Sequence, residues 1–230
     1  MPTLLVFGAR NVGRVLAREL AADGWRVAGV ALTQETIDQL RSEVPDALGL
    51  VGDAGDPDEV ERIFAQVGDV DLVVNAITTT PSFGGPIDEA PPEALDAYVG
   101  KLLPGIFNVM RVGGRVLAER GSGTFVQLTG GSARRGNPGR GPWAAAAFAT
   151  RALAQSQAAE LRERNVHVAL LIVDAIIESE KTKHMLEGEP AERSASMEDV
   201  AAAIAYLHAQ TPRAWTHELQ LTPALERWVP

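Results

Sequence analysis

Short apolar runs alternate with amphipathic segments along most of this sequence. Runs of about four to eight apolar residues are typical of buried strands, and apolar residues three or four positions apart are typical of helices that bury one face. The predicted strands are residues 4–7, 26–32, 48–51, 71–75, 124–128, 167–173 and 218–221. The predicted helices are residues 12–23, 34–44, 57–67, 93–119, 143–164 and 197–208, and interruptions are expected in the fourth of these at Pro104 and at Gly113-Gly114.

This alternation of strands and helices is typical of a parallel sheet covered on both faces. The chain has 230 residues, which suits one domain with a full core. We therefore expect a single α/β domain of the Rossmann type, with a doubly wound parallel sheet of about seven strands. Ligands of such sheets bind beyond the carboxyl ends of the strands. We expect a cofactor-binding part over about 1–125, a substrate-pocket part over about 126–230, and a loose, charged lid over about 176–195.

Composition narrows the classes of partner. The formal charge of −9 argues against nucleic acid or an anionic membrane surface as the main partner, because both favour basic patches. No apolar run is long enough to cross a bilayer. The chain has no cysteine, which excludes disulfides and thiolate ligands, and no metal site is expected. The first residues enter a strand without a basic region before it, so we expect a cytoplasmic protein.

A glycine-containing turn joins the first strand to the first helix. Gly8 permits a tight turn, and Gly13 lets the helix pack closely against it. The N–H groups that follow at Asn11 and Val12 suit a pyrophosphate. The middle glycine of the usual dinucleotide fingerprint is replaced by Arg10. Such a turn is also a common structural device, so its position after the first strand is what favours a nucleotide site.

The end of the second strand bears on which nicotinamide cofactor binds. Folds that prefer NAD(H) place an acid there for the ribose hydroxyls. Here Thr33 follows the strand, and the first acid is Glu35. NADP(H) differs from NAD(H) by a phosphate on the 2′-oxygen of the adenosine ribose. No acid at the end of the strand repels this phosphate, and Arg10 attracts it, so NADP(H) is favoured over NAD(H). The alternatives for Arg10 are a solvated turn residue or an obstacle to the pyrophosphate.

Four further candidates for cofactor binding follow the third and fourth strands. They are Asp53, Ala54, Asn75 and Ala76. Asp and Asn in these places are also common turn formers and caps, so both interpretations stay open.

Taken together, these segments resemble the short-chain dehydrogenase/reductase family over nearly the whole chain. The resemblance continues through residues 105–109, 152–161, 167–176 and 214–219. It implies catalysis by an Asn, Ser, Tyr and Lys tetrad, and a homodimer or homotetramer that assembles through the long helices 93–119 and 143–164. The tail is similar to that of a divergent bacterial branch that commonly lacks the tyrosine.

The family's four catalytic residues are missing from the positions where the resemblance places them. Those positions hold Leu102, Gly130, Trp143 and Ala147. The only tyrosines are Tyr98 and Tyr206, and neither is followed by lysine four residues later. The proton donor that the family uses is therefore absent, whatever the exact alignment.

Three classes of function remain open. The first is a redox enzyme with another proton donor. The second is a non-redox enzyme (cyclase, isomerase or lyase) that uses the family's substrate pocket, and the third is an inactive cofactor-binding sensor or partner subunit. In any of these the ligand is a small molecule. Candidate pocket residues are Thr129, Ser132, Asp174 and His184, each of which also has an ordinary structural interpretation. An arginine cluster is placed to receive a carboxylate or phosphate, although a solvated loop is the simpler reading. It consists of Arg134, Arg135 and Arg140.

Overall fold

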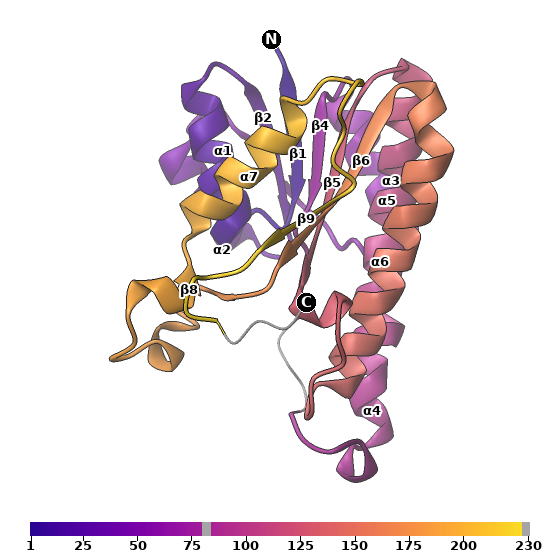
Figure 1. Cartoon of the computed structure of the whole chain (residues 1–230). Helices are drawn as coiled ribbons and strands as arrows, with labels where there is room; N and C mark the ends of the chain where they lie inside the picture. Colours follow the sequence, from indigo (N-terminus) through magenta and orange to yellow (C-terminus); the bar gives the residue numbers. More distant parts are fainter. Residues whose placement is uncertain (80–83, 227–230) are drawn as a thin grey trace.

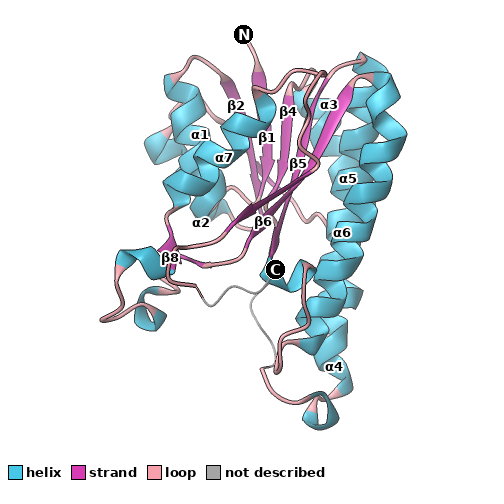
Figure 2. Ribbon diagram, in the orientation of Figure 1, coloured by secondary structure: helices cyan, strands magenta, loops and turns pink. Residues whose placement is uncertain are grey.

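The computed structural model describes residues 1–79 and 84–226 and shows one α/β domain built on a seven-stranded parallel sheet (Figures 1 and 2). The strand order is β3-β2-β1-β4-β5-β6-β9, and every neighbouring pair is parallel. The strands are β1 (Thr3–Phe7), β2 (Arg26–Ala31), β3 (Leu48–Val51), β4 (Leu72–Asn75), β5 (Gly123–Gly130), β6 (Val166–Val173) and β9 (Glu218–Leu221). The expected fold class and sheet are thus confirmed.

Three long helices cover each face of the sheet. One face carries α1 (Asn11–Ala22), α2 (Gln34–Glu43) and α7 (Met197–His208), and the other carries α3 (Pro57–Val67), α5 (Leu103–Arg120) and α6 (Gly141–Leu161). The two groups lie to the left and right of the sheet in Figure 1. A short helix, α4 (Pro92–Leu95), precedes α5. None of the helices in the described ranges is both long and apolar enough to span a membrane.

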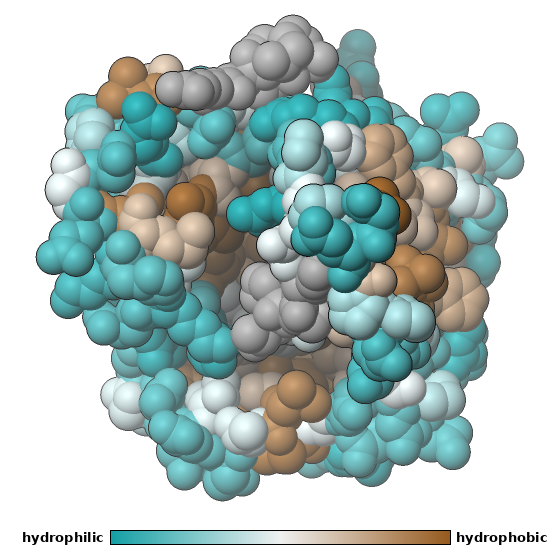
Figure 3. All heavy atoms as spheres, turned by 90° about the horizontal axis from the view of Figure 1, so that it is seen from below, coloured by the Kyte–Doolittle hydropathy of each residue, from teal (hydrophilic) through white to brown (hydrophobic). Residues whose placement is uncertain are grey.

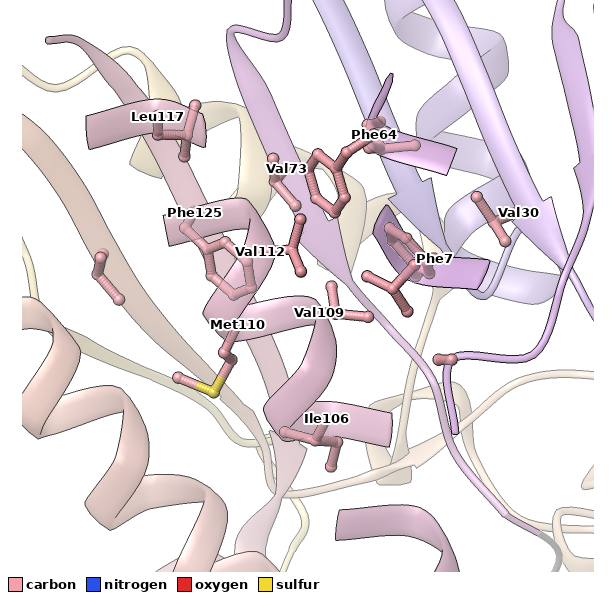
Figure 4. Close-up of a cluster of buried hydrophobic side chains, with 14 of the residues drawn as sticks. Phe7, Val30, Phe64, Val73, Ile106, Val109, Met110, Val112, Leu117 and Phe125 are labelled. Atoms are coloured by element: carbon pink, nitrogen blue, oxygen red, sulfur yellow. The ribbon is translucent and has the colours of Figure 1, made fainter. Parts of the chain in front are cut away.

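The core explains why the central strands read as continuous apolar runs. Along β1, Leu4 and Val6 pack toward α1 and α7, whereas Leu5 and Phe7 pack toward α3 and α5. Both faces of the strand are buried, so no position needs a polar residue. Figure 4 shows the hydrophobic cluster on the side of α3 and α5, in which Phe7 and Phe64 stack with ring centroids 5.8 Å apart.

The expected interruption of the long helix at Gly113-Gly114 is wrong, because α5 runs unbroken through both residues. A β-carbon on Gly113 would lie 2.8 Å from the Phe125 ring, so glycine is needed there for close packing against β5. Pro104 lies just after the start of α5, which continues directly from an irregular helical stretch, so an irregularity is present where the proline predicts one. The helical stretch before it is a π-helix, η2, over Asp96–Leu102.

The segment 176–195, which the sequence predicts to be a loose lid, is tied at its base. Two short parallel strands, β7 (Ile176–Ile177) and β8 (Ser194–Ala195), pair at its ends. The N–H of Glu178 donates to the carbonyl of Ala195 at 3.0 Å. The segment therefore leaves and re-enters the domain at fixed points.

Candidate functional site

The glycine turn lies where the strand order reverses, between β1 and β4. The N–H of Ala76 donates to the carbonyl of Phe7 at 2.9 Å, which holds the ends of these two strands side by side. Gly8 has a φ of +88°, and a β-carbon there would lie 2.7 Å from the carbonyl oxygen of Ala76. Only glycine fits both the conformation and the space. The first candidate residue is thus located at the switch point, where ligands of such sheets bind.

The start of α1 is pressed against this turn. A β-carbon on Gly13 would overlap the carbonyl oxygen of Gly8, so glycine is needed here too. The N–H groups of the first turn, from Asn11 to Gly13, have no acceptor within the helix. That turn carries no acidic residue, and Arg10 at the N-cap makes no side-chain capping bond. The end of the helix therefore presents free donors and its positive dipole to an anion.

Arg10 lies beside the end of β2. The N–H groups of Gly8 and Ala9 both donate to the carbonyl of Val30, at 3.0 and 2.9 Å. The side chain of Arg10 is exposed and makes no ion pair or hydrogen bond within the described residues. Thr33 is also exposed, and its hydroxyl accepts from the N–H of Thr36 at 3.3 Å as the cap of α2. An unpaired guanidinium thus stands near a strand end that has no carboxylate before Glu35.

The residues after β3 and β4 are engaged in local structure. The Oδ1 of Asp53 accepts from the N–H of Gly55 at 2.8 Å, so this side chain forms a turn. Asn75 is fully buried, and its Nδ2 donates to the Oε1 of Gln127 on β5 at 2.9 Å. Ala54 is buried behind Asp53, and its carbonyl oxygen accepts from Asn108 at 3.0 Å. Asn75 therefore fixes the ends of β4 and β5, and its side chain faces the protein interior.

Sequence reasoning missed Gln127 and Asn108. Gln127 could have been noticed as a single polar residue inside an otherwise apolar strand, where a buried amide needs a partner. For Asn108 no sequence signal distinguishes its role, because its partners are backbone carbonyls more than fifty residues away.

A cavity of about 1230 Å³ separates the start of α1 from the segment predicted to be a lid. Arg10, Asn11 and Arg14 line one side, and Lys181 and Lys183 are among the lid residues that line the other. Figure 3 views this edge of the sheet and shows a hollowed face surrounded by hydrophilic side chains. His184 also lines the cavity but is exposed on the lid. The cavity is open and lined by charges of both signs, because five glutamates line it together with Arg10, Arg14 and the two lysines. These glutamates are Glu178, Glu180, Glu187, Glu189 and Glu198.

Two of the four positions assigned to the catalytic tetrad meet at the carboxyl end of β5. A β-carbon on Gly130 would lie 3.6 Å from Cζ2 of Trp143, in ordinary contact. The other two positions are buried: Leu102 lies in the hydrophobic core, and Ala147 is buried on α6. Tyr98, on the π-helix, packs edge-on against Trp143 with ring centroids 5.6 Å apart. This corner of the site is therefore apolar and aromatic.

The carboxylate of Asp174 is held in place by two neighbouring side chains. Arg135 donates from Nη1 and Nη2 to its two carboxylate oxygens at 2.7 and 3.2 Å, and Gln220 donates to Oδ2 at 3.3 Å. A β-carbon on Gly131 would overlap the carboxylate, so glycine makes room for this pair. The proposed arginine cluster is therefore not one unit, because Asp174 neutralises Arg135 while Arg134 and Arg140 are exposed.

Of the hydroxyl candidates, Ser132 is buried in the turn after β5 and Thr129 is half-buried on β5 itself. Both lie at the carboxyl end of the strand, on the same stretch as Gly130. The described residues contain no group of three or more His, Asp or Glu side chains that could hold a metal ion.

Comparisons with known proteins agree with this geometry. A family model described as Enoyl-(Acyl carrier protein) reductase matches residues 7–218. L-xylulose reductase of Bos taurus is 28% identical over 214 residues, which cover 88% of this chain and 87% of that protein. A short-chain dehydrogenase from Rhodopseudomonas palustris is 25% identical, with a TM-score of 0.81 and coverage of 96% and 98% of the two chains.

The closed form of serine dehydrogenase complexed with NADP+ has the same fold, with a TM-score of 0.89 at 16% identity. It covers 99% of this chain and 97% of its own. The switch-point turn, the seven-stranded parallel sheet and the match over residues 7–218 lead to one conclusion. The chain belongs to the short-chain dehydrogenase/reductase family.

Proposed function

We propose that this protein binds NADP(H) and is an atypical oxidoreductase that acts on a small organic substrate without the family's catalytic tetrad. The observation that carries the proposal is the uncapped start of α1 beside an unpaired Arg10, at the switch point and facing the charged cavity. Relatives named as reductases support the reaction class, and a structural neighbour complexed with NADP+ supports the cofactor.

The residues of this edge fit the parts of the cofactor. The first-turn N–H groups of α1 would hold the pyrophosphate, since helix starts bind phosphates. Arg10 would pair with the 2′-phosphate, because the nearby end of β2 has no carboxylate to repel it. Asp53 and Ala54 would lie beside the adenine, and Ala76 beside the linking ribose. Lys181 and Lys183 of the predicted lid line the far side of the cavity together with several glutamates, so the attraction for an anion would come from Arg10 and the start of α1.

When bound, the nicotinamide supplies or accepts the hydride. The protein has to orient the substrate and deliver a proton. None of Leu102, Gly130, Trp143 and Ala147 has a titratable proton for this purpose. Ser132 and Thr129 are hydroxyl groups at the correct edge, and Asp174 is occupied by Arg135. We propose that the proton comes from water, so turnover lacks the ~10²–10⁴-fold contribution of a positioned side-chain acid.

A second candidate is ligand binding without redox turnover, as a sensor, a partner subunit or a non-redox enzyme. The burial of Leu102 and Ala147 favours it, because apolar packing has replaced the polar corner of the site. Turnover of a carbonyl compound that strictly requires NADPH would decide for the first candidate. Turnover that proceeds without any nucleotide, or binding without turnover, would decide for the second.

The test of cofactor binding is titration of the folded protein with NADPH and with NADH, followed by energy transfer from tryptophan to the nicotinamide. We expect NADPH to bind more tightly. Arg10→Ala should weaken NADPH binding about 10- to 100-fold and leave NADH binding nearly unchanged, since a hydrogen bond to a charged group contributes about 1.5–3 kcal/mol.

Arg213→Ala, at an exposed turn beyond α7, is the matched control and should bind both nucleotides as the unaltered protein does. If a folded protein binds neither nucleotide, the cofactor proposal is wrong. Equal losses for NADPH and NADH in Arg10→Ala would place this arginine at the pyrophosphate instead.

We also propose assembly into a homodimer or homotetramer through α5 and α6. Phe107 and Phe148 are 47% and 44% exposed on these neighbouring helices, and α6 also exposes a row of alanines. A helix that is apolar on nearly all sides is normally covered. Light scattering should give a multiple of 24.5 kDa. Phe148→Glu should shift it toward the monomer, whereas Tyr206→Glu on α7 should not; a monomeric parent protein would refute the proposal.

A further inference from the structure

The indole ring of Trp143 is held rigidly at the edge of the candidate site. Tyr98 packs against it edge-on, with an interplanar angle of 63°. On the other side, Cζ2 and Nε1 lie 3.6 and 3.8 Å from the place that a β-carbon on Gly130 would occupy. The ring thus stands between the π-helix and the carboxyl end of β5. Its first-turn position on α6 fixes the backbone.

The N–H of this indole is unused. It donates to no acceptor among the described residues, and it is not one of the polar atoms that are sealed from solvent without a partner. It is therefore open to water or to a ligand. Because residue 130 is a glycine, no side chain at that position competes for the donor. The free donor lies beside the carboxyl end of β5, on the ligand-binding edge of the sheet.

We infer that the Trp143 N–H binds the carbonyl oxygen of the ligand and selects ligands with a flat, apolar body beside that oxygen. This inference rests on the proposed function, since it places the ligand in the same site. An indole N–H is a donor that does not titrate, so it polarises a carbonyl without transferring a proton. Tyr98, Leu102 and Ala147 provide apolar surroundings in which such a hydrogen bond gains strength.

The inference can be tested directly on the indole proton. The chain has four tryptophans, and ¹⁵N labelling makes each indole N–H visible by NMR. Trp143→Phe identifies the signal of Trp143 by its disappearance. The labelled protein is then titrated with acetophenone and with ethylbenzene, which has a similar apolar body but no carbonyl oxygen. Each titration is run with and without NADP+, and proton exchange with water is measured at the same time.

Acetophenone should move the Trp143 proton downfield and slow its exchange, and ethylbenzene should do neither. Trp143→Phe should bind acetophenone about 3- to 10-fold more weakly, which corresponds to the loss of one neutral hydrogen bond. Trp215→Phe, on the opposite edge of the sheet, should bind it normally. Equal responses to the two probes, or no response to acetophenone, would overturn the inference.

The NADP+ arm separates this result from the cofactor proposal. Failure of NADP+ to bind, with the acetophenone response intact, would contradict the proposed cofactor and leave the role of Trp143 supported. Normal NADP+ binding without an acetophenone response would do the reverse. Trp143→Phe replaces one aromatic ring by another, and the indole signals of Trp25 and Trp215 report whether it is folded.

Discussion

The carboxylate of Asp174 shows how the neighbours of a residue decide its role. Only 8% of this residue is exposed, and both carboxylate oxygens accept hydrogen bonds from Arg135. Gly131 leaves the space that the carboxylate fills, and Gln220 supplies a further donor. Gly131 and Arg135 come from the segment after β5, Asp174 directly follows β6, and Gln220 lies on β9. The pair therefore fastens the arginine-containing loop to the far edge of the sheet.

Asp174→Asn should lower the free energy of unfolding by about 2 kcal/mol, because it leaves the charge of Arg135 partly buried without its partner. Arg135 is more exposed than Asp174, so the loss should be smaller than the ~3–5 kcal/mol of a fully buried pair. Urea unfolding measures it. The neighbouring Arg134→Ala, at an exposed position, should change stability by less than about 0.5 kcal/mol. Equal losses in the two variants would show that the Arg135–Asp174 ion pair contributes no more to the free energy of unfolding than an exposed arginine does.

Two adjacent glycines in α5 give a test at the scale of one helix. Gly113→Ala should destabilise the protein by about 1–3 kcal/mol, because its β-carbon would meet the rings of Phe125 and Phe64 at 2.8 and 3.2 Å. This outweighs the ~1 kcal/mol that alanine gains in helix propensity. At Gly114 the obstacles are the ends of the flexible Gln157 and Leu161 side chains.

Gly114→Ala should therefore cost less than Gly113→Ala, since Gln157 can move at the loss of its hydrogen bond to the Met110 carbonyl. Thermal and urea unfolding of the two variants, side by side, measure the difference. The reverse order would mean that α5 shifts away from β5 more easily than Gln157 changes its rotamer.

The same two glycines show which features of the helices and strands can be predicted from the sequence and which cannot. Strand and helix bounds follow from apolar spacing, which is a local property, and the sheet follows from their alternation. Gly113 was misread as a break because its reason lies on β5, outside the helix. Asn75 with Gln127, and Arg135 with Asp174, are pairs 52 and 39 residues apart. Nothing in their local patterns predicts that they meet, so the internal contacts of the site required the structure.

At the scale of the whole molecule, the two edges of the sheet differ in chemistry. The carboxyl edge carries the candidate site, and the amino edge carries a buried histidine, His167, and a half-buried one, His208. His167 stacks on Trp215 with ring centroids 5.1 Å apart and bonds the Thr216 carbonyl at 2.9 Å. His208 contacts Thr124 at 3.1 Å and Trp25 edge-on. These contacts join α7 and the segment before β9 to the sheet.

Burial lowers the pKa of both histidines below the ordinary 6.5. For His167, the hydrogen bond to Thr216 opposes this shift without cancelling it; for His208, the charge of Asp71 does the same. Two carboxyl groups also have lowered pKa values. Burial raises the pKa of Asp71 and Glu218, but hydrogen bonds from Arg120 and Arg151, with the charges of these arginines, lower it further than burial raises it.

All four shifts make the folded protein lose stability as the pH falls. The unfolded histidines take up protons near pH 6.5 while the folded ones resist, so stability is full above pH 6.5 and declines below it toward the folded pKa. A further decline should begin near pH 4.5 and 3.8, where unfolded Glu218 and Asp71 become protonated. Urea unfolding at a series of pH values measures both. His167→Gln and His208→Gln should each reduce the loss of stability that begins below pH 6.5. His184→Gln, at an exposed position, should leave that loss unchanged. If neither the His167 nor the His208 variant changes it, other groups are responsible.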